Sequence, residues 1–118
     1  MKQELFDIAL EHIRQQGRPS LNEYGQCRYR TEDGLSCAAA PFIQDYDPSM
    51  EHVGFIRLVE DAHYQPRLDP RAVTHFELVC ELQTAHDSAT DGPDFMFCYE
   101  ANMRQVARSF NLVYGPVA

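Results

Sequence analysis

Two of the four cysteines in this 118-residue chain lie on either side of a turn-like TEDG stretch, and their type and placement could support chemistry. These two are Cys27 and Cys37, and the other two are Cys80 and Cys98. The four thiols form no CxxC pair and no repeated spacing, the patterns that identify a structural zinc site from sequence. A metal clip, a disulfide loop and a turn with inward-packed thiols are therefore all open explanations for Cys27 and Cys37.

A second group of polar residues interrupts the apolar face of a predicted helix over 70–87. The apolar residues there recur at helical spacing and define a buried stripe, which consists of Ala72, Phe76, Val79, Cys80 and Leu82. Gln83 falls near the middle of this stripe, and His86 and Asp87 fall on either side of its centre. A polar group that faces a core costs on the order of 1–3 kcal/mol unless it is hydrogen-bonded, so these side chains need partners.

Two interpretations of this polar helix end are open. In the first, which we expect, Gln83, His86 and Asp87 form a hydrogen-bonded network that ties the helix to the turn region. In the second, His86 and Asp87 approach Cys27 or Cys37 and form a metal shell or a catalytic cluster, since thiolate and imidazole are good zinc ligands. We therefore expect no cofactor, with zinc held by Cys27, Cys37 and His86 as the alternative.

The rest of the chain carries no pattern that is typical of catalysis. The other histidines form no HxxxH or HExxH motif, and the sequence has no Gly-rich phosphate loop, no GxSxG and no DxD. A cysteine and a histidine can still meet in the fold as a nucleophilic pair, so this possibility stays open. We expect a protein that is not an enzyme.

The elements that would position these residues are mostly helical. We expect helices over residues 3–16, from 48 to about 62, over 70–87 and from 94 to about 111, with a loop over 89–93. Gly17 suits the end of the first helix, and Asp47–Pro48 and Asp69–Pro70 are typical helix starts. The sequence predicts one α+β domain over 1–118, mainly α-helical, with about four helices and one small antiparallel β-hairpin.

The hairpin is predicted around Asp33–Gly34, because glycine accepts the positive φ that a tight turn needs. In the expected register the facing pairs are Thr31 with Leu35 and Tyr29 with Cys37. Because side chains alternate between the two faces of a strand, Cys27 and Tyr29 would point inward. Arg28 and Arg30 would project from the outer face, where they are candidate contacts for a partner.

Composition and charge exclude some classes of function. The chain has 10 basic and 18 acidic residues and a net charge of −8, which argues against direct binding to nucleic-acid phosphates. No apolar run is long enough to span a bilayer, and the N-terminal stretch lacks the apolar core of a signal peptide. We therefore expect a cytoplasmic protein that does not act at a membrane, and reduced thiols, because the cytoplasm disfavours disulfides.

The stretches CRYRTEDGLSCAAAPFI and LQTAHD resemble a family of small, mostly uncharacterised proteins of tailed bacteriophages and prophages. The matching positions are Cys27, Tyr29, Arg30, Gly34, Cys37, Ala38 and Ile43 in the first stretch, and Leu82, Gln83, His86 and Asp87 in the second. The chain departs from the family pattern at Ala40, where glycine is usual, and at Gln44, where proline is frequent. The resemblance implies a phage origin within a bacterial host cell, and it implies no established activity.

Three functional hypotheses follow from these observations and the resemblance. The first is a non-enzymatic phage protein that binds and inhibits a host protein, such as a CRISPR component or another antiviral defence component, with Arg28 and Arg30 among its contacts. The second is a small metal-binding or cysteine/histidine-dependent enzyme that uses Cys27, Cys37, His86 and Asp87. The third is a structural or self-associating phage protein, for which a homodimer stays open.

Overall fold

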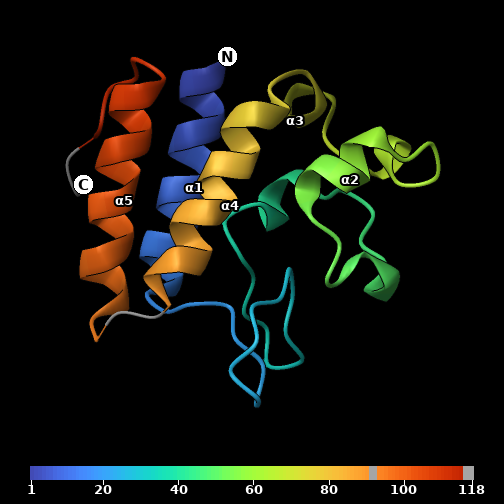
Figure 1. The fold of residues 1–118 in the computed structure, drawn as a ribbon, viewed down its shortest axis with the longest axis horizontal. Helices are drawn as coiled ribbons and strands as arrows, with labels where there is room; N and C mark the ends of the chain where they lie inside the picture. Colours follow the sequence, from blue (N-terminus) through green and yellow to red (C-terminus); the bar gives the residue numbers. More distant parts are fainter. Residues whose placement is uncertain (91–92, 116–118) are drawn as a thin grey trace.

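A computed structural model of the protein describes residues 1–90 and 93–115. This part of the chain contains five α-helices, α1 (Lys2–Gln16), α2 (Phe55–Glu60), α3 (Pro70–Thr74), α4 (Phe76–Ala89) and α5 (Phe95–Ser109), and three short 3₁₀ turns, η1 (Ala40–Phe42), η2 (Pro48–Met50) and η3 (Gln65–Arg67). The three long helices lie side by side, and the segment between α1 and η1 extends beyond one end of them (Figure 1). Within the described ranges, no helix has the length and apolar character that crossing a membrane requires.

The ends of the long helices follow the local signals in the sequence. Gly17 adopts a left-handed conformation with φ 73° and closes α1 by donating its N–H to the Ile13 carbonyl at 2.7 Å. The side chain of Asp69 accepts the Arg71 N–H at the start of α3, and Asp94 caps α5 in the same way. The predicted loop over 89–93 includes residues 91–92, which lie outside the described residues.

Two of the predicted helices are broken. The helix expected over 70–87 is divided at His75, whose φ and ψ of −110° and 42° separate α3 from α4. The helix expected from Pro48 is only a 3₁₀ turn, capped by Asp47, and a positive φ of 65° at His52 precedes the start of α2. The expectation of about four helices is therefore wrong, and the described residues form five.

The predicted β-hairpin is also wrong, and with it the α+β class. Among residues 1–90 and 93–115 there is no strand, and the extended pairing consists of three isolated antiparallel bridges, Leu21 with Cys27, Arg30 with Ser36 and Ile43 with Leu68. The Arg30–Ser36 bridge lies in the segment expected to form the hairpin. The fold described by the structure is mainly α-helical, with a long non-helical segment between α1 and η1.

Competing hydrogen bonds explain why the turn does not extend into strands. The Cys37 N–H bonds the Tyr29 carbonyl at 3.1 Å, but the reciprocal bond of an antiparallel pair is not made. The Tyr29 N–H donates to Glu51 Oε1 at 2.9 Å instead, and the Cys37 carbonyl accepts the Ala40 N–H at 3.2 Å. Each group that would continue the ladder already has another partner, so the pairing ends there.

Side chains also occupy both outer edges of the turn. On one edge, Gln16 of α1 accepts the Ser36 N–H and donates to the Ser36 carbonyl, both at 2.9 Å. On the other edge, Glu51 Oε2 accepts the Arg30 N–H at 3.1 Å. These bonds satisfy the outward N–H of Arg30 and both outward backbone groups of Ser36, with which an additional strand would otherwise pair. The segment is therefore ordered by side chains from outside it.

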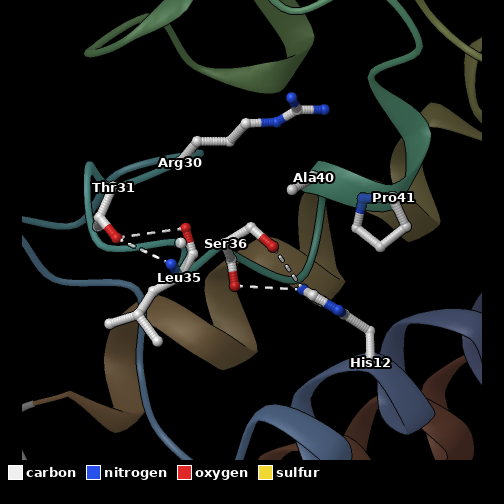
Figure 2. A pocket seen from close by; sticks show the side chains of 8 residues that line it. His12, Arg30, Thr31, Leu35, Ser36, Ala40 and Pro41 are labelled. Carbon is white, nitrogen blue, oxygen red and sulfur yellow. Dashed lines mark hydrogen bonds between the residues drawn. The ribbon is translucent and has the colours of Figure 1, made fainter.

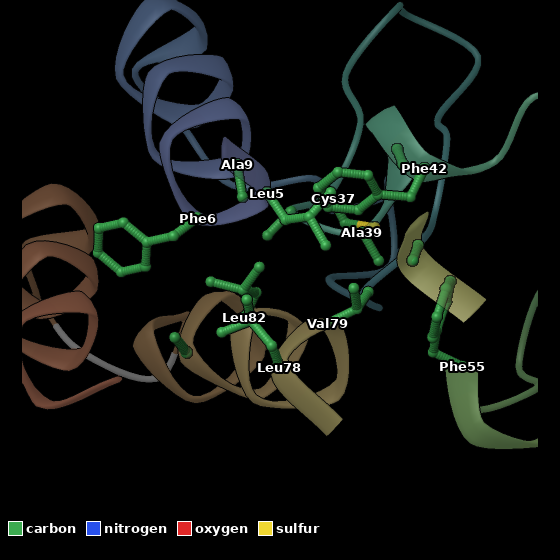
Figure 3. Close-up of a cluster of buried hydrophobic side chains, with 14 of the residues drawn as sticks. Leu5, Phe6, Ala9, Cys37, Ala39, Phe42, Phe55, Leu78, Val79 and Leu82 are labelled. Carbon is green, nitrogen blue, oxygen red and sulfur yellow. The ribbon is translucent and has the colours of Figure 1, made fainter. Parts of the chain in front are cut away.

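The hydrophobic core lies between α1, α4 and α5. Leu5 of α1 points toward Leu82 of α4, with Cys37 and Phe42 beside it, and Phe6 of α1 points toward α5 (Figure 3). The predicted stripe on 70–87 is partly confirmed, because Ala72, Val79 and Leu82 are buried whereas Phe76 and Cys80 are half-buried. The core thus fixes α4 with its polar end directed toward the segment between α1 and η1.

Candidate functional site

The polar end of α4 is built around His86, whose side chain is fully buried. Its Nε2 lies 3.0 Å from the Ser20 backbone nitrogen, and its Nδ1 lies 2.8 Å from Asp87 Oδ1. A backbone N–H can only donate, so Nε2 is the acceptor and the ring proton is on Nδ1. His86 is therefore held as a neutral imidazole that donates from Nδ1 to the Asp87 carboxylate.

Gln83 extends this arrangement by one turn of the helix. Its Nε2 donates to Asp87 Oδ1 at 2.8 Å, and its Oε1 accepts the Ala39 N–H at 3.1 Å. Ala39 belongs to the turn after Cys37, whereas Ser20 follows α1. The three polar side chains of α4 thus bond one another and the backbone at two separate points of the segment between α1 and η1.

Cys27 lies next to this network. Its Sγ is 4.0 Å from the Thr90 hydroxyl. One possible metal-ligand atom from each of Cys27, His86 and Asp87 falls within 4.8 Å of the others. The structure therefore brings together three of the four residues proposed from sequence for a metal or cysteine/histidine site.

The hydrogen bonds of His86 do not fit a zinc ligand in this arrangement. A metal on Nδ1 would shift the ring proton to Nε2, where it would face the Ser20 N–H. A metal on Nε2 would displace that N–H and leave it without a partner. Either geometry loses a buried hydrogen bond that the protein now makes.

The hydrogen bonds of His86 also oppose nucleophilic catalysis by Cys27. A Cys–His pair needs an imidazole lone pair directed at the thiol. In His86 the lone pair on Nε2 accepts the Ser20 N–H, and Nδ1 donates to Asp87. The imidazole consequently has no free nitrogen with which to deprotonate Cys27.

Cys37 lies apart from these groups, in the hydrophobic core (Figure 3). It is fully buried, and burial raises the pKa of its thiol to about 12. None of the four cysteines, all of which the structure describes, forms a disulfide. Cys37 accordingly packs as a small apolar side chain, one of the explanations left open by the sequence.

Sequence reasoning missed a histidine–serine pair on the other side of the turn. His12 Nε2 lies 2.9 Å from Ser36 Oγ and 3.2 Å from the Ser36 carbonyl oxygen, beside a pocket of about 490 Å³ (Figure 2). The carbonyl can only accept, which places the ring proton on Nε2. His12 therefore donates to Ser36 and does not act as its base. His12 lies one helical turn before Gln16 on α1, so both side chains of α1 hold Ser36 by hydrogen bonds.

The candidate contact residues Arg28 and Arg30 line a second pocket, of about 560 Å³. Arg30 is exposed, and its guanidinium lies 4.9 Å from the centre of the Tyr46 ring. Arg28 is half-buried, and its Nε is buried without a hydrogen-bond partner. Arg18 and the 79% exposed Tyr24 line the same pocket. Periodicity could not have revealed this grouping, because the residues meet through an irregular segment.

Comparison with known proteins adds no relative: no family model matches the chain, and no curated protein or solved structure matches it.

Proposed function

We propose that this chain is a non-enzymatic phage protein that binds a protein of the bacterial host and inhibits it, with a CRISPR or other antiviral defence component as the expected target. One observation carries the proposal: in an acidic chain, Arg28 and Arg30 line one pocket without forming an ion pair among the described residues. Unpaired arginine beside exposed aromatic surface is a frequent feature of protein–protein contacts.

The polar groups of α4 support a binding function over an enzymatic one. Both nitrogens of His86 are engaged in hydrogen bonds, and the Asp87 carboxylate accepts from two neighbours through Oδ1. The network stabilises the segment that carries Arg28 and Arg30. The phage origin and the host target rest on the resemblance of the two sequence stretches.

Affinity capture from bacterial lysates tests the proposal. We expect the tagged wild-type protein to retain one host protein in near-stoichiometric amount, and that host protein to lose activity when the purified chain is added. The Arg28→Gln/Arg30→Gln variant should retain much less of it. Arg57→Gln/Arg108→Gln removes the same charge elsewhere and serves as the control. Failure of the wild-type chain to retain or inhibit any protein from several hosts would contradict the proposal.

A further inference from the structure

The pocket beside Arg28 gathers basic side chains from both halves of the segment between α1 and η1. Arg18 and Tyr24 come from its first half, and Arg28 and Arg30 from its second half. Two hydrogen bonds hold the second half in place, one from the Gln16 side chain to the Ser36 carbonyl and one from the Arg30 N–H to Glu51. The pocket is thus presented by a segment whose backbone is fixed at several points.

The charges of these arginines are not neutralised within the described part of the chain. Three arginines elsewhere, Arg14, Arg67 and Arg71, each lie within 4.0 Å of a carboxylate. Arg18, Arg28 and Arg30 form no such ion pair there, although Glu23, Glu32 and Asp33 line the same pocket. The acidic side chains surround the basic ones without engaging them.

Arg28 supplies an independent observation. Its Nε is buried and has no hydrogen-bond partner among the described residues. A buried N–H without an acceptor is unfavourable, and native proteins seldom contain one. Arg28 lines the pocket, so the terminal nitrogens of its guanidinium, and not the shielded Nε, are the donors that an entering acceptor would meet. A planar carboxylate suits a guanidinium especially well, because its two oxygens match two parallel N–H donors.

We infer that the pocket lined by Arg18, Arg28 and Arg30 binds a carboxylate of an acidic peptide segment in the partner protein. This inference rests on the proposed binding function and names its chemistry. Tyr24 beside the arginines offers an exposed aromatic surface against which a peptide can pack. A phosphate group is disfavoured because it carries more negative charge toward Glu23 and Glu32.

A binding titration with a fluorescently labelled tetraglutamate peptide tests the inference, with tetraglutamine as the uncharged control. We expect the wild-type chain to bind tetraglutamate and not tetraglutamine, and the binding to weaken at high salt. Arg28→Gln should raise the Kd at least about fivefold. Arg18→Gln and Arg30→Gln change exposed residues, and each should raise it by about twofold to fivefold.

Two further variants sharpen the test. Glu32→Gln removes a like charge from the pocket and should lower the Kd by about twofold, the opposite direction. Arg108→Gln, on the last turn of α5, loses the same charge far along the chain and should leave the Kd unchanged. Equal binding by the wild-type chain and all three pocket arginine variants overturns the inference. Displacement of the peptide by inorganic phosphate, but not by glutarate, overturns it as well.

The outcome of this titration is separable from that of the lysate capture. If a host protein is captured and inhibited while the three arginine variants bind tetraglutamate as the wild type does, the pocket inference fails and the proposed function stands. If tetraglutamate binding depends on the arginines while no host protein is captured, the carboxylate site stands and the proposed function fails.

Discussion

At the scale of one residue, the His86 imidazole is the centre of the hydrogen-bond network formed with Gln83 and Asp87. Its two nitrogens reach backbone and side-chain partners from different parts of the chain, and Phe95 packs edge-on against the ring at 5.4 Å between centroids. Phe95 is the first residue of α5, and its ring stacks on Tyr99 one turn further along that helix. One buried side chain therefore connects α4, α5 and the segment that follows α1.

Substitution of this residue is expected to destabilise the protein. His86→Leu keeps a similar volume but leaves the Ser20 N–H without its acceptor and Asp87 Oδ1 without one donor. We expect the free energy of unfolding to fall by about 2–4 kcal/mol, measured by urea denaturation. His63→Leu, at an exposed position, should change it by less than about 0.5 kcal/mol. Equal effects of the two substitutions would contradict the network.

Whether the protein binds zinc also depends on single residues, above all on the hydrogen bonds of His86. The ligand atoms of Cys27, His86 and Asp87 are close enough to suggest a metal, but the two hydrogen bonds of His86 oppose it. We expect that added zinc does not raise the melting temperature and that native mass spectrometry shows the bare chain mass. An increment of one zinc that disappears in His86→Ala would instead establish a metal site and revive the second hypothesis.

At the scale of elements, side chains from outside the turn over residues 25–37 form hydrogen bonds with its backbone, where a β-sheet would have a neighbouring strand. Gln16 and His12 of α1 form hydrogen bonds with Ser36. Glu51, which follows η2, accepts the N–H groups of Tyr29 and Arg30. Gln83 of α4 accepts the Ala39 N–H. Apart from the contact of His12 with the Ser36 hydroxyl, each of these bonds satisfies a backbone group that would otherwise be open to another partner. The backbone of the turn is therefore held in one conformation although it forms no sheet.

Glu51 is expected to contribute most of the stabilisation on one edge of the 25–37 turn. It accepts the N–H groups of Tyr29 and Arg30 and the hydroxyl of Tyr46. Glu51→Ala should lower the free energy of unfolding by about 1–3 kcal/mol and speed amide hydrogen exchange at residues 29 and 30. The exposed Glu60→Ala is the control. Unchanged exchange at both amides would show that Glu51 does not order the turn.

The hydrogen bonds of His12 with Ser36, on the other edge of the turn, predict that the stability of the protein depends on pH. Burial lowers the pKa of His12, with hydrogen bonding to the Ser36 carbonyl opposing the shift in part. Because the folded protein binds this proton more weakly than the unfolded chain, stability falls as the pH drops below the unfolded value of about 6.5. His12→Gln should flatten the pH dependence of the urea midpoint between about pH 7 and pH 5. An unchanged slope would refute the assignment.

At the scale of the whole molecule, the two ends of the described chain meet. Gln3 of α1 exchanges hydrogen bonds with the Val113 backbone, and Arg14 bonds Glu100 of α5 at 2.7 Å and the Tyr114 hydroxyl at 3.1 Å. Tyr114 also donates to Glu100. These contacts join α1, α5 and the segment after α5, and Figure 1 shows α1 and α5 lying side by side.

The Arg14 cluster contributes to global stability because both charged side chains are largely buried, at 13% and 22% exposure. Arg14→Gln removes the guanidinium that bonds Glu100 and should lower the free energy of unfolding by about 1–3 kcal/mol. Arg108→Gln, an exposed change of the same charge, should alter it by less than about 0.5 kcal/mol. Thermal and urea unfolding provide the measurement, and similar losses in both variants would contradict a specific role for Arg14.

The sequence by itself determined the local features of the protein. The positions of Gly17, Asp69 and Asp94 mark helix ends correctly, because caps depend on residues within one turn. Helical spacing also placed Gln83 and His86 toward the protein interior, since a side chain's face follows from its position along the helix.

Only the tertiary structure decided what these residues contact. The 25–37 turn does not form a hairpin because Glu51 accepts the Tyr29 N–H and Ala40 donates to the Cys37 carbonyl, and neither residue belongs to the turn. The proton on His86 Nδ1 was decided by Ser20, far away in sequence. The grouping of Arg18 with Arg28 required the irregular path of the chain between α1 and η1. Periodicity describes which face a side chain occupies, whereas hydrogen-bond partners and pockets depend on distant residues that meet only when the chain is folded.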